Sequence, residues 1–339
     1  MSRYADAHAN PKGPGDARPT ALQIVKDEGL LGKLTDKVVL ITGGNQGIGL
    51  ETARALHATG ATVYITARSP EKIEQGINDI ISWPEVKSDS PVHGIELRLD
   101  SLASVRAAAK DILAKVDKLN ILILNAGVMA TPEGRTEDGF ETQFGINHLG
   151  HFLLFQLLKP ALLKATTPLF QSRVISVSSK AHRFGRMRWG DFNFEKETYN
   201  PWHAYAQSKT ANIYFAAEVE RRYADQGLHG LSVHPGSILT NLGKYVNIAT
   251  LDLDGPLKNV LRNKAQGAAT TVYAALSKDW EGRGGKYLTD CKVEEPMRPG
   301  LEPTSIELGH AAWIYDEDAE RRLWEESNKM VGHHSDRDE

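Results

Sequence analysis

The chain has 339 residues, of which 41% are hydrophobic and 24% charged, as is usual for a globular protein. Its formal net charge of −3 provides no broad basic field, so small-molecule chemistry is favoured over nucleic acid or an anionic membrane as a partner. Cys291 is the single cysteine, which excludes an intrachain disulfide and a thiolate metal cluster.

Neither a secretory signal nor a membrane-spanning segment is expected. Residues 1–20 contain no apolar run of the kind that signal peptides and anchors need. The longest apolar stretches, such as 121–124 and 152–158, are far shorter than the roughly 20 residues that cross a bilayer. We therefore expect a soluble, cytoplasmic protein.

Residues 1–20 are predicted to be unstructured and 20–29 to form a short outer helix. From residue 37 onward, short β-branched runs alternate with amphipathic helical patterns. The predicted strands are 37–42, 62–67, 93–99, 120–124, 173–177, 230–234 and 286–289. The predicted helices are 47–58, 70–81, 102–116, 139–165, 201–225, 264–277 and 317–330. The alternation predicts an α/β fold with a doubly wound parallel sheet of about seven strands and helices on both faces.

This pattern divides the chain into three parts. An N-terminal extension covers 1–36, and one cofactor-binding catalytic domain covers 37–300. A helical C-terminal extension covers 301–339 and ends in a polar tail at 332–339 that we expect to be frayed.

A glycine-rich turn follows the first predicted strand and opens the next helix. Glycines there allow a tight turn and let the backbone approach a pyrophosphate, whose charge sits on free amides at the helix N-terminus. The spacing Gly-x-x-x-Gly-x-Gly differs from the Gly-x-Gly-x-x-Gly typical of dinucleotide-binding turns, but the strand before and the helix after favour a dinucleotide. The candidate cofactor-binding residues of this turn are Gly43, Asn45, Gln46, Gly47, Ile48 and Gly49.

The end of the second predicted strand indicates which cofactor is used. An acidic residue there would accept hydrogen bonds from an adenosine ribose, but this chain has Arg68, which suits a 2′-phosphate. NADP(H) is therefore favoured over NAD(H), although Arg68 could merely be an exposed strand-end residue. Asp100 could contact the adenine region, cap the helix that begins at Ser101, or do both.

Polar groups follow three further predicted strands where each ends. Open α/β sheets place their ligands at this edge. The residues are Asn125, Ala126 and Gly127 after one strand, Ser178 and Ser179 after the next, and Pro235, Gly236, Ile238 and Thr240 after a third.

Tyr205 and Lys209 stand four residues apart on a predicted helix and so share one face. A tyrosine has an ordinary pKa of about 10, and a fixed ammonium nearby favours its ionised form. We therefore expect Lys209 to lower the pKa of Tyr205. A single Tyr-x-x-x-Lys occurs easily by chance, so the inference depends on the other motifs that accompany it.

Together these motifs resemble the short-chain dehydrogenase/reductase family over roughly residues 37 to 290. The matching pieces are Thr42-Gly43-x-x-x-Gly47-x-Gly49, Asp100, Asn125-Ala126-Gly127, Asn147, Ser179, Tyr205-x-x-x-Lys209, and Pro235-Gly236 with Thr240. The segments Phe144 to Phe152 and Val177-Ser-Ser-Lys-Ala-His182 are most similar to the retinol dehydrogenase and WW-domain oxidoreductase branch. The resemblance implies a Rossmann-type domain.

The resemblance also implies catalytic roles. Tyr205 would exchange a proton with the substrate oxygen, and Ser179 would hydrogen-bond the same oxygen. Ser179 is preferred to Ser178 because the family uses the later serine of the pair. Lys209 would bind the nicotinamide ribose, and Asn147 would hold a water linking Lys209 to solvent.

The connection 181–203, between Ser179 and Tyr205, is long and rich in aromatic residues. It is either a wall of the substrate pocket or a loop folded back as a small satellite core. Its histidines His182 and His203 have no metal-ligand spacing to Asp191 or Glu195, so no metal site is expected.

We therefore expect an NADP(H)-dependent oxidoreductase. Its substrate should be a small hydrophobic molecule, aromatic or not, that carries a carbonyl or hydroxyl group. The alternatives are a ketoreductase of natural-product biosynthesis and a cofactor-binding sensor or scaffold without turnover. The resemblance makes a homodimer or homotetramer plausible through helices 139–165 and 201–225, although the terminal extensions could block it.

Overall fold

The computed structural model describes residues 3–247 and 255–333. A central sheet has the strand order β10-β9-β6-β5-β4-β1-β2-β3, and every neighbouring pair is parallel except β9 with β10. Its strands are β1 (Val38–Thr42), β2 (Thr62–Ala67), β3 (Val92–Glu96), β4 (Ile121–Leu124), β5 (Ser172–Val177), β6 (Leu228–Val233), β9 (Lys286–Thr289) and β10 (Lys292–Val293). The predicted fold class and all seven predicted strands are confirmed.

The additional eighth strand is β10. It turns back from β9 through Asp290 and Cys291, both of which have positive φ angles, of 52° and 55°. Two-residue hairpin turns of this kind normally carry Asn or Gly. The sequence lacks that signal here, and the prediction of seven strands missed the hairpin for this reason.

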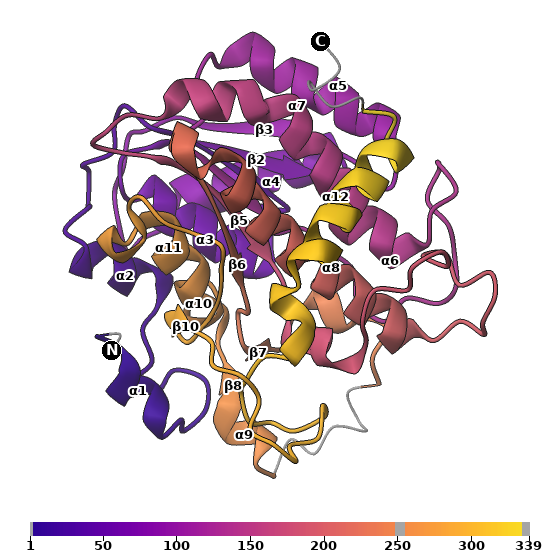
Figure 1. The fold of residues 1–339 in the computed structure, drawn as a ribbon. Helices are drawn as coiled ribbons and strands as arrows, with labels where there is room; N and C mark the ends of the chain where they lie inside the picture. Colours follow the sequence, from indigo (N-terminus) through magenta and orange to yellow (C-terminus); the bar gives the residue numbers. More distant parts are fainter. Residues whose placement is uncertain (1–2, 248–254, 334–339) are drawn as a thin grey trace.

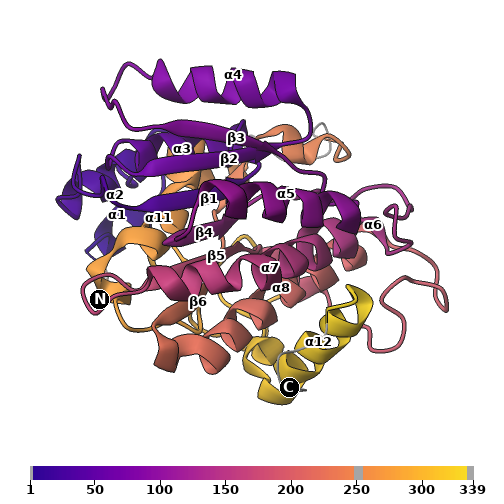
Figure 2. The same cartoon turned by 90° about the horizontal axis from the view of Figure 1, so that it is seen from above.

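Helices cover both faces of the sheet (Figures 1 and 2). They are α3 (Gly47–His57), α4 (Pro70–Ile81), α5 (Leu102–Lys115), α6 (Thr142–Phe144), α7 (Gly150–Ala165), α8 (Pro201–Tyr223), α10 (Lys264–Gly267), α11 (Ala269–Leu276) and α12 (Glu317–Met330). Smaller elements are α1 (Ala5–Ala9), α2 (Ala21–Asp27), α9 (Leu257–Val260) and a second sheet of β7 (Ser237–Ile238) and β8 (Leu261–Arg262).

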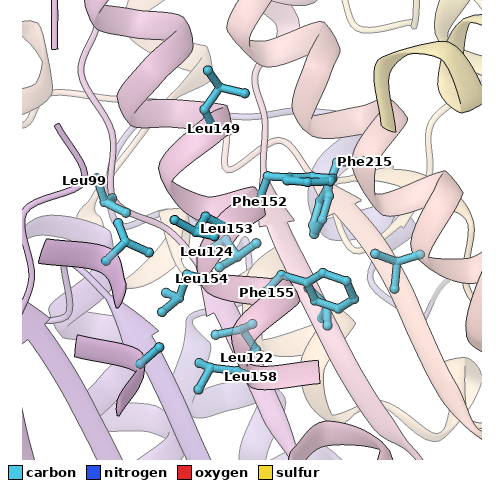
Figure 3. Packing of buried hydrophobic residues seen from close by; sticks show 14 of the residues in the cluster. Leu99, Leu122, Leu124, Leu149, Phe152, Leu153, Leu154, Phe155, Leu158 and Phe215 are labelled. Atoms are coloured by element: carbon cyan, nitrogen blue, oxygen red, sulfur yellow. The ribbon is translucent and has the colours of Figure 1, made fainter. Parts of the chain in front are cut away.

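Alternating side chains of the strands form two cores. Leu40, Leu122 and Leu124 face α5, α7 and α8, where Phe152 and Phe155 pack beside them (Figure 3). The intervening strand residues, such as Ile41 and Ile123, belong to a second core with α2, α3 and α11. Side chains two residues apart share a face of a strand, so burial on both faces requires the nearly continuous apolar runs that this sequence has.

Two predicted helices differ in detail from the observed ones. The segment predicted as one helix over 139–165 begins at Thr142, where the Glu141 carboxylate accepts the amides of Gln143 and Phe144. It then passes through a π-helical turn, η1 (Gly145–Leu149), before α7. The helix predicted at 264–277 is divided into α10 and α11, with an Asn263–Gln266 capping box at the start of α10.

The prediction that 1–20 are unstructured is wrong for the described part of this segment. Residues 5–9 form α1, and Arg18 is buried with its guanidinium against backbone carbonyls of residues 259–261. The polar composition of this segment suggested disorder, but its Arg18 forms hydrogen bonds that hold the segment to residues 259–261. The predicted short helix is confirmed as α2, capped by Thr20, and residues 334–339 of the predicted frayed tail lie outside the described residues.

Candidate active site

The glycine turn between β1 and α3 requires glycine at each of its four glycine positions, either for the backbone angle or for close packing. Gly43 and Gly47 have φ angles of 64° and 59°, and a Cβ on Gly44 would lie 2.6 Å from Ile65 Cγ2. A Cβ on Gly49 would overlap the Gly43 carbonyl oxygen. Gln46 is the N-cap of α3 but makes no side-chain hydrogen bond to its first amides. The turn is thus a close backbone cradle with free N–H groups, as a pyrophosphate requires.

The other predicted residues of the turn lie at its rim. Gln46 is exposed, and its Oε1 accepts a hydrogen bond from Asn241 Nδ2 at 3.2 Å. Asn45 packs closely on Gly76 of α4, where a Cβ would approach Asn45 to within 2.8 Å. Ile48 faces α10 near Gly267. The turn is therefore held by α4, by α10 and by the loop after β7.

Thr42 joins the glycine turn to the end of β4. Its Oγ1 accepts the amides of Asn125 and Ala126 at 2.9 and 3.0 Å, and Asn125 Nδ2 donates to the Thr42 carbonyl. Since Thr42 Oγ1 already accepts two N–H groups, it donates its own proton to His151 Nε2 at 2.9 Å. The predicted segment 125–127 is thereby fixed beside the turn.

Asn147 lies in the π-helical turn η1, and its side chain is fully engaged. Its Oδ1 accepts the amide of Val128, and its Nδ2 donates to the Val128 carbonyl and to Ser208 Oγ, all within 2.8–2.9 Å. A Cβ on Gly127 would lie 3.0 Å from Asn147 Oδ1 and 3.6 Å from Lys209 Nζ. The predicted Gly127, Asn147 and Lys209 therefore meet, although a water relay through Asn147 stays a prediction.

His151, four residues after Asn147, was missed by the sequence reasoning. Its Nδ1 donates to the Asn147 carbonyl at 3.0 Å, which fixes the tautomer, and burial lowers its pKa to about 3. A neutral histidine thus connects Thr42 with the turn that carries Asn147. The signal that could have revealed it is the spacing of four, which places both residues on one helical face.

Ser179, Tyr205 and Lys209 converge from two elements. Ser179 lies two residues after β5, and its Oγ accepts the amide of Ala181 at 3.1 Å, while a hydrogen bond from Ser179 to Tyr205 lowers the pKa of that phenol. Tyr205 and Lys209 lie on α8, with Lys209 Nζ 5.5 Å from the Tyr205 ring centroid. The competing Ser178 points elsewhere, since its Oγ donates to the Lys209 carbonyl. The structure thus brings Ser179, and not Ser178, to Tyr205.

The expected lowering of the Tyr205 pKa by Lys209 is not found. Burial raises the pKa of Tyr205 to about 12, against the smaller opposing effect of Ser179. Burial also lowers the pKa of Lys209 to about 7, and Lys209 Nζ donates to the Val177 carbonyl at 3.0 Å. Both side chains are almost inaccessible to water, so the cost of burying each charge dominates. The phenol is consequently protonated at neutral pH.

Arg68 and Asp100 follow the carboxyl ends of β2 and β3. Arg68 is exposed directly after β2. Asp100 pairs with Arg98 at 3.2 Å and does not cap α5, because Ser101 holds the N-cap position and the Asp138 carboxylate accepts the amide of Leu102. The capping alternative for Asp100 is therefore wrong.

The segment after β6 faces the glycine turn from the other side. Gly236 has a φ of 93° and lies closely against the Arg262 guanidinium, while Ile238 in β7 pairs with Arg262 in β8. Arg262 also donates to the Pro235 carbonyl at 3.5 Å. Thr240 lies beside Gly47, with 4.0 Å between its Cγ2 and a Cβ placed on that glycine.

The aromatic residues of 181–203 divide into two groups. Phe192 stacks on Phe144 at 5.2 Å and so packs on the main core, while the Tyr199 ring packs on Phe194 and its hydroxyl bonds Thr131 and Glu141. By contrast, Trp202 lies 6.3 Å from the Tyr205 ring and 6.5 Å from Phe184, and it is 40% exposed. Part of the insert is therefore folded back on the domain, in the main core and not in a separate one, while the role of Trp202 as a wall of the substrate pocket stays a prediction.

A family model for short chain dehydrogenase matches residues 37–250. This chain belongs to the short-chain dehydrogenase family. The chain is 46% identical to short-chain dehydrogenase/reductase prx1 of Penicillium roqueforti over 332 residues, which cover 97% of this chain and 95% of the relative. It is 39% identical to retinol dehydrogenase 14 of Mus musculus, with coverages of 89% and 87%. The resemblance to the retinol dehydrogenase branch is confirmed.

A solved structure supports the same assignment. The crystal structure of an uncharacterized protein from Mycobacterium Paratuberculosis is 33% identical in sequence, with a TM-score of 0.63, and covers 88% of this chain and 94% of that chain. The chain is therefore an oxidoreductase of a family that binds a nicotinamide cofactor.

Two further findings concern the described residues only. In 3–247 and 255–333, no helix is both long and apolar enough to span a membrane. Within the same part of the chain, no three His, Cys, Asp or Glu side chains gather as metal ligands. The glycine turn, by contrast, fits a dinucleotide, since Gly43 and Gly47 have positive φ angles and Gly44 and Gly49 pack too closely on Ile65 and on the Gly43 carbonyl to carry a Cβ.

Proposed function

We propose that this short-chain dehydrogenase transfers hydride between NADP(H) and a carbonyl or hydroxyl carbon of a hydrophobic small molecule, with Tyr205 as the acid/base. The observation that carries the proposal is the meeting of Ser179 with Tyr205, with Lys209 beside them, next to the glycine cradle. Burial favours the protonated phenol, and this supports proton donation by Tyr205 during carbonyl reduction.

Each side chain has a distinct task in the proposed step. The nicotinamide supplies or accepts the hydride when bound. In reduction Tyr205 gives a proton to the carbonyl oxygen, and in the reverse direction its phenolate takes a proton from the alcohol. Ser179 donates a hydrogen bond to the same oxygen and so stabilises charge that develops on it. Lys209 holds the ribose hydroxyls, Asn147 fixes the 127–128 backbone, and the remaining predicted residues bind the cofactor.

The test of this proposal is Tyr205→Phe, which removes only the phenolic oxygen. Turnover in a screen of hydrophobic ketones, aldehydes and secondary alcohols, followed by NADPH absorbance, should fall by about 10²-fold or more. Cofactor affinity, measured by NADPH fluorescence, should stay within about twofold. Tyr199→Phe is the matched control, since the Tyr199 hydroxyl bonds Thr131 and Glu141 and none of the reacting groups. Full turnover by Tyr205→Phe would refute the acid/base assignment.

The preference for NADP(H) is supported by Arg68, which is exposed at the end of β2 where no carboxylate stands. A hydrogen bond to a charged group contributes about 1.5–3 kcal/mol. Arg68→Gln should therefore lower the kcat/KM ratio of NADPH to NADH by about 10- to 100-fold. Lys72→Gln, also exposed in the first turn of α4, is the control. Equal rates of the unaltered protein with both cofactors would contradict the preference.

A hydrophobic substrate is supported by the partly exposed Trp202 ring beside Tyr205 and by the relatives named retinol dehydrogenase. Trp202→Ala should raise the KM for bulky apolar substrates by about tenfold, since a buried aromatic contact is worth roughly 1.5 kcal/mol. Small carbonyl substrates should be less affected. The non-catalytic alternative predicts firm cofactor binding without turnover of any compound in the screen.

The oligomeric state is proposed from α12. This helix lies along α8 (Figure 2). Its Trp324 is in edge-to-face contact with Phe152 and Phe155 of α7. Assembly through α7 and α8 would require α12 to leave, so we propose that the chain functions as a single copy. Light scattering after gel filtration should give the mass of one chain, and a dimer would contradict this.

A further inference from the structure

The turn that carries Ser179 is held by a distant part of the chain. Ser179 is the N-cap of the 3₁₀ helix η2 (Lys180–Phe184). The third residue of η2, His182, is fully buried, and its Nδ1 lies 2.7 Å from the Ser179 carbonyl oxygen. On its other side, His182 Nε2 lies 3.1 Å from the backbone nitrogen of Ala311.

The two contacts fix the state of this imidazole. A carbonyl oxygen can only accept, so His182 Nδ1 carries the proton, and Nε2 is then the acceptor for the Ala311 amide. Burial lowers the pKa of His182 to about 3, which keeps the ring neutral. Tyr287 packs edge-to-face on it at 5.0 Å. A ring with both nitrogens engaged and its face covered has one orientation.

Residues 305–311, which we call the C-terminal strap, hold η2 at several points. Arg183 Nε donates to the Gly309 carbonyl at 2.7 Å, and its Nη1 donates to the Glu307 carbonyl at 2.8 Å. The strap in turn pairs with the segment after β10, where the His310 amide donates to the Glu295 carbonyl at 2.8 Å. Among these contacts, the imidazole of His182 provides the link to Ser179 itself.

We propose that His182 is a positioning residue for Ser179, through which the C-terminal strap sets the place of the serine hydroxyl relative to Tyr205. The proposal rests on the proposed function. In this role the neutral imidazole of His182 donates a hydrogen bond to the Ser179 carbonyl and accepts one from the Ala311 amide. The motif Ser-Ser-Lys-Ala-His therefore contains both Ser179 and the residue that positions it, His182.

Three substitutions separate the two hydrogen bonds. His182→Phe keeps the ring and removes both bonds. His182→Asn places an amide N–H near the position of Nδ1 and can retain the bond to Ser179, whereas His182→Gln extends an acceptor toward Ala311 and abandons Ser179. We expect kcat to fall by about 10²-fold in His182→Phe and His182→Gln, since misplacement by about 1 Å has that effect. His182→Asn should recover most of kcat, with the KM for NADPH unchanged throughout.

His229→Phe is the matched control, because His229 is a buried histidine at the other end of the sheet that bonds Gln171 and Glu220 and touches neither Ser179 nor the strap. It should lower the melting temperature and leave kcat unchanged. A kcat loss in His229→Phe as large as in His182→Phe, or equal kcat for all three His182 variants, would overturn the proposal in favour of a structural role. Rates are normalised to the folded fraction measured by cofactor binding.

The outcome is distinguishable from failure of the proposed function. If Tyr205→Phe retains turnover, the acid/base assignment fails whatever His182 does. If Tyr205→Phe is inactive and His182→Phe has unaltered kcat, only the positioning role fails. Independently of any substrate, nitrogen NMR of the full chain with labelled histidine should show His182 protonated at Nδ1 and neutral at pH 5. An Nε2-protonated ring would overturn the proposal.

Discussion

The N-terminal extension and the last helix of the C-terminal extension are held to the domain by opposite kinds of contact. In the N-terminal extension, Arg18 places its guanidinium among backbone carbonyls, 2.6 Å from that of Leu261 and 3.0 Å from that of Val260. In the C-terminal extension, α12 is held by Trp324, which stacks with Phe215 and packs against Phe152 and Phe155. Polar contacts of Arg18 thus fix the loop around residues 259–261, while apolar packing of Trp324 makes α12 part of the core.

This difference assigns separate tasks to the two ends. The carbonyls that Arg18 binds belong to α9 and β8, and β8 pairs with β7, which carries the proposed cofactor contact Ile238. The C-terminal extension instead reaches Ser179, through the strap. We expect damage at the N-terminal end to weaken cofactor binding and damage at the C-terminal end to affect global stability and turnover.

The largest expected effect is that of Trp324→Ala. Removing a buried tryptophan costs about 3–5 kcal/mol, because the lost contacts leave a cavity between α7 and α8. The free energy of unfolding, measured with urea, should fall by that amount. Trp83→Ala is the matched control: this ring lies under the Arg54 guanidinium at the surface, and its loss should cost about 1 kcal/mol. A change below about 1 kcal/mol in Trp324→Ala would mean that α12 is not integral to the core.

A second test uses pH. His148 bonds Ser327 of α12 at 2.7 Å, and burial lowers its pKa to about 3. Because its pKa in the unfolded chain is near 6.5, the unfolded state binds more protons below that pH, so stability is present above pH 6.5 and is lost as pH falls toward 3. Between pH 7 and 5 this group alone should remove about 2 kcal/mol.

His148→Gln supplies the comparison for the pH experiment. This variant retains a polar group that can reach Ser327 but cannot titrate. Its unfolding free energy should depend less steeply on pH between 7 and 5 than that of the unaltered protein. Identical slopes would show that His148 remains neutral in both folded and unfolded chains or is accessible when folded.

How much of the fold and of the candidate site can be predicted from the sequence depends on where the partner of each residue lies along the chain. The strands and the glycine turn follow from local periodicity, and Tyr205 with Lys209 from a spacing of four on one helix. The partners of Arg18 are backbone carbonyls, which every residue type presents alike. His182 meets Ala311, 129 positions along the chain. No local pattern contains such contacts, so the sequence showed the reacting groups but not what holds them.

The pKa of Tyr205 shows a further limit. The spacing to Lys209 correctly placed an ammonium near the phenol, but the direction of the shift depends on how dry the site is. Both side chains are buried, and burial disfavours both charges more than their proximity favours them. The degree of burial is a property of the packed fold. It could not be obtained from the four-residue spacing between Tyr205 and Lys209.

The smallest expected effect, and the sharpest test of the comparison, is Arg18→Met. Methionine keeps much of the apolar stem but donates no hydrogen bonds, so residues 13–18 should separate from 259–261 without unfolding the domain. Cofactor affinity should fall about tenfold, or about 1.4 kcal/mol, while kcat at saturating cofactor stays unchanged. Hydrogen exchange at 257–263 should increase. Arg3→Met, which removes a half-exposed ion pair with Glu28 elsewhere in the same extension, is the control. If Arg18→Met increased exchange but left cofactor affinity intact, the N-terminal extension would have no part in holding β7, and the division of tasks between the two ends would fail.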